Sequence, residues 1–420
     1  MKKIAFYLNN QSLQRIDYSK IISNNPGLPG SEYEILFISY LLDKRDNNFS
    51  IYLMSNNTGN FPHENVLFAK DLEECCNSCL KNGISTIVID LKSFNKSILD
   101  KYNGKISVVI WAHNTISYHL LNVFYNLPYI KKIINVGREQ MELYRDQLAT
   151  LKSTYIYNTI PIKSKDFYKS KTIKSNNHNV VYMGSIIPVK GFHILAKAWK
   201  KILYRIPDAQ LYVIGNGQLY DRSVILGKYG IAEQTYEDKF IKYLTDSNGK
   251  ILPSVHFMGL MGEEKFDIIG KCKVGVPNPT GITETFCICG IEMQLTGCNI
   301  VTIKHPAFLD TIIDKSFLYR KTSSLAKNTI QALLKDKIND NEYNKRYSII
   351  NDNFGIEKNI IKWEYELENI STIHLYPISK YNYQNKKLKN IILKLKIKYP
   401  FLQKIIPPIE LIYIYIKRYI

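Results

Sequence analysis

The stretch NVVYMGSIIPVKGFHIL, residues 179–195, contains the unit from which the fold can be inferred. An apolar run of strand length ends at Gly184, a short loop follows, and Lys190 and Gly191 stand just before a helix-length segment. A strand, a glycine-containing loop and a helix in this order form the repeating unit of a doubly wound parallel sheet. Lys190 could place a compact positive charge on a phosphate at the end of that strand.

The same unit recurs on both sides of this stretch. Strand-like runs separated by helix-length segments occur at residues 4–8, 48–56, 85–91, 106–114, 131–137 and 153–159, and again at 210–217, 254–260, 272–279 and 299–304. None of them alternates cleanly between apolar and polar residues, which predicts parallel sheets covered on both faces. A chain of 420 residues is also too long for one ordinary core.

We therefore expect an α/β protein with two Rossmann-like, doubly wound domains that face each other across a cleft. The expected boundaries are 1–170 for the N-terminal domain and 171–345 for the C-terminal one, with the polar segment 163–179 as a linker. Ligands of such sheets bind at the carboxyl ends of the strands. Residues 346–375 should form a helix that returns to the N-terminal domain.

Residues 376–420 form a basic amphipathic tail. Leu388, Ile391, Ile392 and Leu395 make one helical stripe among lysines, and Glu410 is the single acid after Lys380. This pattern is typical of a helix lying on anionic lipid. A helix that packs on the N-terminal domain, with its lysines merely solvated, explains the pattern equally well.

The net charge of +19 indicates phosphate-bearing partners: nucleic acid, anionic lipid or nucleotide substrates. A nucleic-acid-binding protein would need aromatic platforms or a groove-reading motif among its basic residues, and we find neither. The seven cysteines show no zinc spacing with histidines, and Cys75, Cys76 and Cys79 fall in a helical pattern. Reduced thiols of a cytoplasmic protein are a better interpretation than a metal site.

Two glutamates stand eight positions apart in GITETFCICGIEMQLTGC, residues 281–298. In one regular helix Glu284 and Glu292 would lie on different faces, an objection that disappears if Glu284 lies in a preceding loop. We expect Thr283 or Thr285 to cap a helix that runs from Phe286 to near residue 297. Glu292 would then lie among apolar neighbours, where a carboxylate needs hydrogen-bond donors such as vicinal hydroxyls.

Such an arrangement suits a nucleotide sugar. The hexose would lie near Glu284, the diphosphate at the helix start and the ribose at Glu292. Two glycine-rich loops could assist: NNPGLPGSE, in which Gly27 and Gly30 let backbone N–H groups approach an anion, and GNG at 215–217, for which a structural role is favoured.

ETFCICGIE followed by MQLTGC resembles the E-x7-E signature of retaining GT-B glycosyltransferases of the family 4 type (glycosyl transferases group 1). YMGSIIPVKGFHIL resembles the strand–loop–helix with a KG element of that family, and NPGLPGSE resembles its N-terminal glycine loop. The likeness extends over about residues 1–370. It implies a GT-B fold and a hexosyltransferase that retains the anomeric configuration, acting in bacterial surface polysaccharide, lipopolysaccharide or glycolipid synthesis.

The resemblance also implies roles for single residues. Glu284 would contact the donor sugar and Glu292 the ribose. The diphosphate would be held by Lys190, by the amides near Thr285 and Phe286, and by Gly30 from the other domain. His113, in WAHN, matches the position that touches the region of the sugar 6-hydroxyl. The family usually has an arginine after the glycine that matches Gly184, whereas this chain has Ser185, so one charge partner of the phosphate is missing.

Enzymes of this class use no metal, and no metal or other cofactor is expected here. The expected partners are a nucleotide sugar, a glycan or lipid-linked acceptor and an anionic membrane surface, without nucleic acid. The expected location is the cytoplasm or the inner face of the cell membrane. Two rivals share the fold: a nucleotide-sugar epimerase, and an inactive homologue that scaffolds a biosynthetic complex, which Ser185 keeps open.

Overall fold

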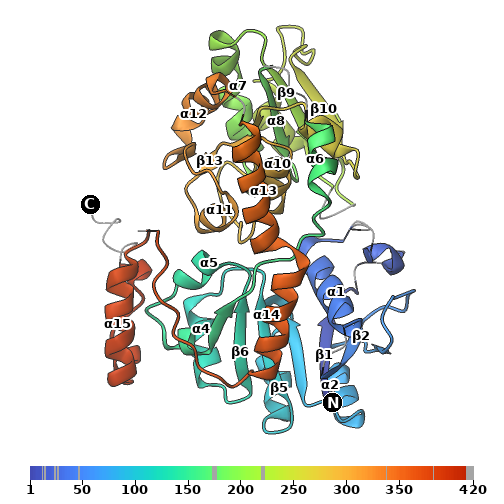
Figure 1. The fold of residues 1–420 in the computed structure, drawn as a ribbon, viewed down its shortest axis with the longest axis vertical. Coiled ribbons are helices and arrows are strands. Elements are labelled where there is room, and N and C mark those ends of the chain that lie inside the picture. The colour runs from blue at the N-terminus through green and yellow to red at the C-terminus, as the bar shows by residue number, and fades with distance from the viewer. Residues whose placement is uncertain are drawn as a thin grey trace. The chain divides into compact units, whose positions relative to one another are not determined.

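The computed structural model describes residues 1–11, 13, 16–22, 25, 28–45, 48–172, 177–218, 223–336, 338–381 and 383–412. The chain forms two compact units (Figure 1). Unit 1 comprises Met1–Pro161 and Ile356–Ile420, and unit 2 comprises Ile162–Gly355. The crossings between the units thus lie at Pro161 and Gly355, about ten residues away from the boundaries expected at 170 and 345.

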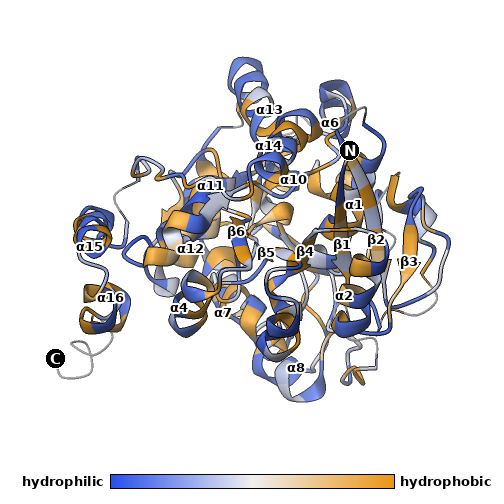
Figure 2. Ribbon diagram, turned by 90° about the horizontal axis from the view of Figure 1, so that it is seen from below, coloured by the Kyte–Doolittle hydropathy of each residue, from blue (hydrophilic) through white to orange (hydrophobic). Residues whose placement is uncertain are grey.

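Unit 1 is built on a seven-stranded sheet in which every strand pair is parallel. Its strands are β1 (Lys2–Leu8), β2 (Phe49–Ser55), β3 (Val66–Phe68), β4 (Thr86–Asp90), β5 (Ser107–Ala112), β6 (Ile130–Asn135) and β7 (Ser153–Tyr155). They lie in the order β3-β2-β1-β4-β5-β6-β7. All five residues of β4 are buried, as expected for a strand covered on both faces. Figure 2 shows hydrophobic residues concentrated in β1 and β2.

The helices of unit 1 connect these strands and carry the last part of the chain. They are α1 (Gly30–Asp43), α2 (Leu72–Lys81), α3 (Lys96–Leu99), α4 (Tyr118–Asn126), α5 (Arg138–Glu142), α14 (Ile356–Glu368), α15 (Lys386–Lys398) and α16 (Leu402–Ile405), with 3-10 turns at Tyr18–Ile22, Leu91–Ser93, Asp100–Tyr102 and Leu148–Lys152. Asp71 caps α2 by accepting a hydrogen bond from the Glu74 N–H. The ring of Trp363 on α14 packs 4.4 Å from that of Trp111 on β5.

Unit 2 has a five-stranded parallel sheet in the order β10-β9-β8-β11-β12 and a separate pair, β13 and β14. The strands are β8 (Asn179–Met183), β9 (Gln210–Ile214), β10 (Val255–Gly259), β11 (Val274–Gly275), β12 (Asn299–Ile300), β13 (Thr302–Ile303) and β14 (Leu318–Tyr319). The helices are α6 (Lys165–Lys171), α7 (Phe192–Arg205), α8 (Gln234–Ile241), α9 (Lys265–Ile269), α10 (Ile288–Leu295), α11 (Pro306–Thr311), α12 (Leu325–Leu334) and α13 (Asp340–Phe354), with 3-10 turns at Pro188–Lys190 and Thr322–Ser324.

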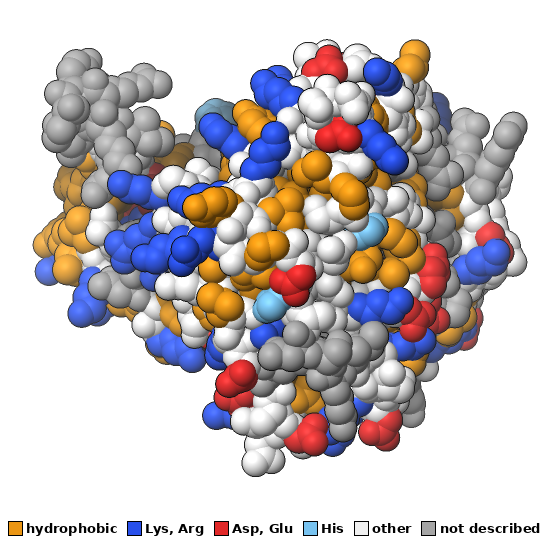
Figure 3. Space-filling view, turned by 90° about the horizontal axis from the view of Figure 1, so that it is seen from above, with side chains coloured by type: hydrophobic (Ala, Val, Ile, Leu, Met, Phe, Trp, Pro, Cys, Tyr) orange, Lys and Arg blue, Asp and Glu red, His pale blue; other side chains and the backbone are white. Residues whose placement is uncertain are grey.

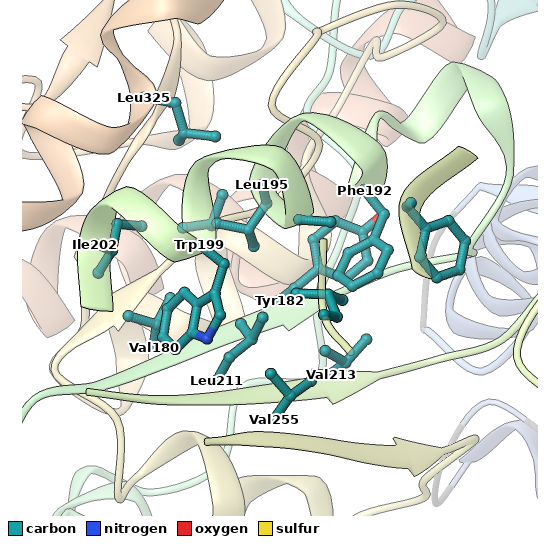
Figure 4. Packing of buried hydrophobic residues seen from close by; sticks show 14 of the residues in the cluster. Val180, Tyr182, Phe192, Leu195, Trp199, Ile202, Leu211, Val213, Val255 and Leu325 are labelled. Carbon is teal, nitrogen blue, oxygen red and sulfur yellow. The ribbon is translucent and has the colours of Figure 1, made fainter. Parts of the chain in front are cut away.

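The core of unit 2 lies where α7 covers β8 and β9 (Figure 4). Trp199 on α7 is fully buried among side chains of the strands, and its Nε1–H donates to Ser254 Oγ at 3.1 Å. Leu195 and Ile202 lie on the same face of α7, one helical turn to either side, as the apolar spacing predicts.

Three details of the expected layout are wrong. The segment 163–179 contains α6, because Ser164 caps that helix and Tyr168 is buried. The run NIVTIK divides into β12 and β13, which belong to different sheets. The single helix expected at 346–375 is two helices, α13 and α14, which are separated at Gly355, where ψ is 165°.

Each sheet reverses its strand order at one point, between β1 and β4 in unit 1 and between β8 and β11 in unit 2. Loops that follow two such strands diverge and leave room for a ligand. The search for a site therefore begins after β8 and β11 in unit 2, and after β1 and β4 in unit 1. Among the described residues, no helix is long and apolar enough to cross a bilayer.

Candidate functional site

Lys190 and Glu284 meet at the switch point of unit 2. Lys190 ends the 3-10 turn after β8, and Glu284 lies in the loop after β11. Lys190 Nζ donates to Glu284 Oε2 at 2.9 Å, and both side chains are largely shielded from solvent. The sequence placed these two residues 94 positions apart, and the fold makes them an ion pair.

Gly191 lets the two loops approach each other. Its φ is 69°, and a Cβ at this position would lie 2.4 Å from Thr280 Cγ2. The Thr280 hydroxyl donates to the Val189 carbonyl at 3.0 Å, which fixes the contact. Glycine is thus needed here for both its left-handed backbone and its lack of a side chain.

Asn278 organises the loop that carries Glu284. Its Oδ1 accepts hydrogen bonds from the N–H groups of Thr280 and Gly281, and its Nδ2 donates to the Ile282 carbonyl and to Glu284 Oε2. Glu284 therefore accepts from both Lys190 and Asn278 with the same oxygen. The carboxylate is held in one orientation before any ligand arrives.

The helix after Glu284 begins later than expected. Thr283 has φ 60°, a left-handed conformation that is costly for a β-branched residue, and α10 starts only at Ile288. The capping residue is Cys287, whose Sγ accepts from the Gly290 N–H. The expectation that Thr283 or Thr285 caps a helix from Phe286 is therefore wrong, and Thr285 and Phe286 lie in the turn between Glu284 and the helix.

Glu292 projects from α10 and has a cationic partner. Its Oε1 accepts from Lys265 Nζ at 2.6 Å, and Lys265 is the first residue of α9, in the segment after β10. The Glu292 side chain is 15 % exposed. A carboxylate at this depth needs a donor, and Lys265 supplies it.

Gly184 and Ser185 lie directly after β8 and under the GNG loop. A Cβ on Gly215 would lie 2.1 Å from the Gly184 carbonyl oxygen, so the two loops touch through their backbones. Ser185 is buried, and its hydroxyl donates to the Asn216 carbonyl at 3.4 Å. A hydroxyl turned toward the backbone replaces the positive charge that the family resemblance implies at this position.

In unit 1, His113 follows β5 and pairs with the last residue of β4. His113 Nδ1 lies 2.7 Å from Asp90 Oδ2, and both side chains are buried. Burial raises the pKa of Asp90, but the interactions with His113, together with those of Lys92, outweigh burial and lower it. Asp90 thus fixes the imidazole in place.

Gly30 is also in unit 1, where it is the first residue of α1. An added Cβ there would meet no atom within 4 Å, so packing does not explain the glycine. Gly27 lies outside the described residues.

The expected site residues therefore fall into two groups. Gly184, Ser185, Lys190, Glu284, Thr285, Phe286 and Glu292 belong to unit 2, whereas Gly30 and His113 belong to unit 1.

Sequence reasoning missed four polar residues of these sites: Asp90, Lys265, Asn278 and His305. Burial lowers the pKa of His305, and the negative charge of Glu284 opposes this shift. Asp90 and Asn278 stand near the ends of the runs at 85–91 and 272–279, and His305 directly follows the run at 299–304, so the strand-end rule could have found them. Lys265 carries no such signal.

The cysteines have packing roles. Cys75, Cys76 and Cys79 lie in the core of unit 1, where burial raises the pKa of Cys76 to about 12. Cys287 and Cys289 flank the start of α10, with their sulfur atoms 3.6 Å apart. Within the described part of the chain, no three histidine, cysteine or acidic side chains are grouped so that they could hold a metal ion.

Comparison with known proteins places this geometry in context. Residues 164–350, nearly all of unit 2, match the family described as "Glycosyl transferases group 1". The chain is also 22 % identical over 382 residues to an uncharacterized glycosyltransferase of Haemophilus influenzae, which covers 87 % of this chain and 99 % of that protein.

Solved structures agree with these matches. HepE of Anabaena, crystallised with UDP and glucose, superimposes with a TM-score of 0.58 at 15 % identity, over 88 % of this chain and 100 % of HepE. The lipopolysaccharide outer core galactosyltransferase WaaB gives a TM-score of 0.53 at 12 % identity, over 87 % of this chain and 99 % of WaaB. The expected fold is confirmed: two Rossmann-like domains of the GT-B type. The comparisons support a glycosyltransferase.

Proposed function

We propose that the protein transfers a hexose from a nucleoside-diphosphate sugar to a glycan or lipid-linked acceptor, with retention of anomeric configuration. The single observation that supports this most is the Lys190–Glu284 ion pair at the switch point, inside the segment that matches glycosyl transferases group 1. A cation and a carboxylate held side by side suit a ligand with a phosphate next to sugar hydroxyls.

The donor is proposed to replace interactions that the unliganded protein makes with itself. Lys190 leaves Glu284 and forms an ion pair with the diphosphate. The hydroxyls of the hexose donate to Glu284, which Asn278 keeps in place. The ribose hydroxyls donate to Glu292, which its hydrogen bond with Lys265 keeps oriented. Each carboxylate keeps one protein donor when the ligand arrives, so neither is left as an uncompensated charge.

In the transfer step, the bond between C1 of the hexose and the diphosphate oxygen breaks, and the oxygen of an acceptor hydroxyl bonds to C1 from the same face. The proton of that hydroxyl passes to the departing diphosphate oxygen. Lys190 and the N–H groups at the start of α10 stabilise the negative charge that develops on the diphosphate. Glu284 acts by electrostatics and positioning. No metal or other cofactor takes part in this scheme.

His113 is proposed to contact the hexose from unit 1. Asp90 engages Nδ1, so Nε2 is the ring atom that would meet a sugar hydroxyl. Gly30 would bring the backbone at the start of α1 near the diphosphate. Because Ser185 is turned toward the Asn216 carbonyl, Lys190 carries the charge that an arginine at position 185 would share.

Two relatives suggest the chemistry of the donor and the process. HepE was crystallised with UDP and glucose, which supports a uridine-diphosphate hexose as donor. WaaB is a lipopolysaccharide outer core galactosyltransferase, which supports a role in lipopolysaccharide, surface polysaccharide or glycolipid synthesis.

A thermal-shift screen of nucleotide sugars tests this function. A bound donor stabilises the folded state by mass action, so one nucleoside diphosphate and its hexose derivative should raise the melting temperature. Lys190→Met should reduce that shift. Nuclear magnetic resonance of the product made with the best donor then reports the anomeric configuration. The proposal fails if no nucleotide sugar raises the melting temperature, or if the product is inverted.

A further inference from the structure

Helices α15 and α16 expose hydrophobic side chains on the surface of unit 1. We call these residues the outer face: Leu388, Ile391, Leu395, Ile397, Tyr399, Phe401 and Ile405, each between 41 and 65 % exposed. Figure 2 shows the two helices beside each other, and hydrophobic side chains gather at the left edge of Figure 3, where they lie. A contiguous exposed patch of hydrophobic side chains of this size usually indicates a binding surface.

The outer face exists because the opposite face of α15 is charged and turned inward. Lys386, Lys389, Leu393 and Lys396 recur at helical spacing and are buried. Lys386 Nζ donates to Glu139, and Lys389 Nζ donates to the Leu143 carbonyl at 2.6 Å and to Glu410 at 2.8 Å. Three of the four buried residues of α15 are therefore lysines, although the packing alternative expected the lysines to be solvated.

Buried acids of unit 1 impose this orientation. Glu139 and Asp146 lie in or just after α5 and are almost completely buried. Asp146 also accepts from the Ile409 N–H at 2.8 Å, and its charge opposes the lowering of the Lys396 pKa by burial. Rotating α15 so that its leucines face inward would break the Lys386–Glu139 pair and move the charge of Lys396 away from Asp146, which leaves two buried carboxylates uncompensated.

The charges next to the outer face have one sign. Lys387, Lys394, Lys398 and Lys404 are exposed among its apolar residues. Glu410, the single acid after Lys380 in the sequence, is already bonded to Lys389. Apolar side chains interspersed with exposed lysines are the chemistry of a helix that lies in a membrane interface.

We propose that the outer face docks on an anionic lipid bilayer. The apolar residues would enter the boundary between headgroups and acyl chains, and the four exposed lysines would meet lipid phosphates. A second copy of this chain is a poorer occupant, because a self-complementary contact would bring lysines against lysines. The inference stands independently of the proposed sugar transfer, since none of these residues belongs to the candidate site.

Vesicle sedimentation with the full-length protein tests the proposal. Wild type should bind vesicles of phosphatidylcholine with phosphatidylglycerol, bind vesicles of phosphatidylcholine alone much less, and dissociate as sodium chloride increases. Replacing Leu388, Ile391 and Leu395 together with Ser should weaken binding at least about tenfold. Replacing the four exposed lysines with Gln should weaken it about fivefold per lysine.

Matched controls keep the test specific. Tyr204, Ile225 and Leu334 in unit 2 are between 66 and 86 % exposed, and changing all three to Ser should leave vesicle binding unchanged. Lys197, Lys200, Lys201 and Lys242 are exposed lysines of unit 2, and their replacement by Gln should matter much less than the same change in α15 and α16. Circular dichroism and melting temperatures confirm that every variant is folded.

Three results would overturn the proposal. In the first, the wild-type protein does not bind anionic vesicles, and in the second, it binds vesicles with and without phosphatidylglycerol equally. The third such result is that the serine variant binds vesicles as tightly as wild type. If light scattering shows a dimer that the three serine substitutions dissociate, while vesicles are not bound, the outer face is an interface between copies of this chain instead.

Discussion

Lys265 Nζ lies 2.6 Å from Glu292 Oε1, and this contact joins the start of α9 to the second turn of α10. It explains how a carboxylate can stand among Ile291, Met293 and Leu295, all of them buried, without a ligand. The same pairing is made by Lys190 and Glu284 at the other end of the segment. Both glutamates of the candidate site are thus paired with a lysine from another element of unit 2, Lys190 from a 3-10 turn and Lys265 from α9.

Glu284→Gln should lower kcat about a hundredfold and leave the affinity for UDP nearly unchanged. The substitution removes charge where the hexose is proposed to lie, and it also frees Lys190 for the diphosphate. Steady-state kinetics and calorimetry with UDP measure the two quantities. Weaker UDP binding with an unchanged kcat would contradict the proposed role.

Glu292→Ala should weaken UDP binding roughly tenfold to a hundredfold, because it removes a charged hydrogen-bond acceptor from the ribose and leaves Lys265 without its partner. Calorimetry with UDP measures this loss. Glu357→Ala, which removes an exposed ion pair with Arg45, serves as the matched control and should change nothing. If the substitutions at 284 and 292 have small and equal effects on kcat and on UDP affinity, the roles proposed for the two glutamates are wrong.

Transfer should continue in the presence of EDTA. The proposed mechanism stabilises the leaving diphosphate with Lys190 and backbone N–H groups, so no cation is required. Initial rates with and without EDTA, and after addition of Mg²⁺ or Mn²⁺, provide the measurement. Complete loss of activity that either ion restores would require a different mechanism.

Glu34 on α1 should make the stability of the protein depend on pH. Burial raises the pKa of this carboxyl to about 8, although the Thr159 N–H donates to Oε2 and lowers it in part. The folded state therefore holds a proton that the unfolded state releases near pH 4.5. This contribution to stability is fully present below about pH 4.5 and is lost progressively as the pH rises to about 8.

Glu34→Gln should remove this dependence, since the amide stays neutral and its oxygen can still accept from Thr159. We expect the melting temperature of wild type to fall by at least about 4 °C between pH 5 and pH 8 relative to that of the variant. Differential scanning calorimetry across this range provides the test. Parallel curves for the two proteins would show that Glu34 is ionised in the folded state.

The two doubly wound units could be predicted from the sequence because each buried strand is a short apolar run with a helix-length segment after it. The short strands β3 and β14 could not be predicted, because strands of two or three residues are too short to show a pattern. Within the candidate site, Lys190 and Glu284 could be named from their loops. Their ion pair could not be derived, because it depends on how Gly191 and Thr280 pack.

The orientation of α15 shows a second limit. Its apolar stripe was visible in the sequence, but the buried acids that turn its lysines inward lie about 250 residues earlier. Periodicity describes a helix alone and carries no information on what lies beneath it. The charged groups of two distant segments decide that outcome.

The division of unit 1 has a consequence for synthesis on the ribosome. Its sheet is made early, yet Lys132 on β6 is buried and pairs at 2.8 Å with Glu366 on α14, and Trp111 packs on Trp363. These partners emerge only after all of unit 2. Unit 2 can therefore finish folding first. Until α14 emerges, the sheet of unit 1 has an uncovered apolar face, and Lys132 lacks its partner Glu366. During translation the sheet of unit 1 therefore stays incomplete until its missing helix appears, and in that interval its exposed apolar face is prone to aggregation.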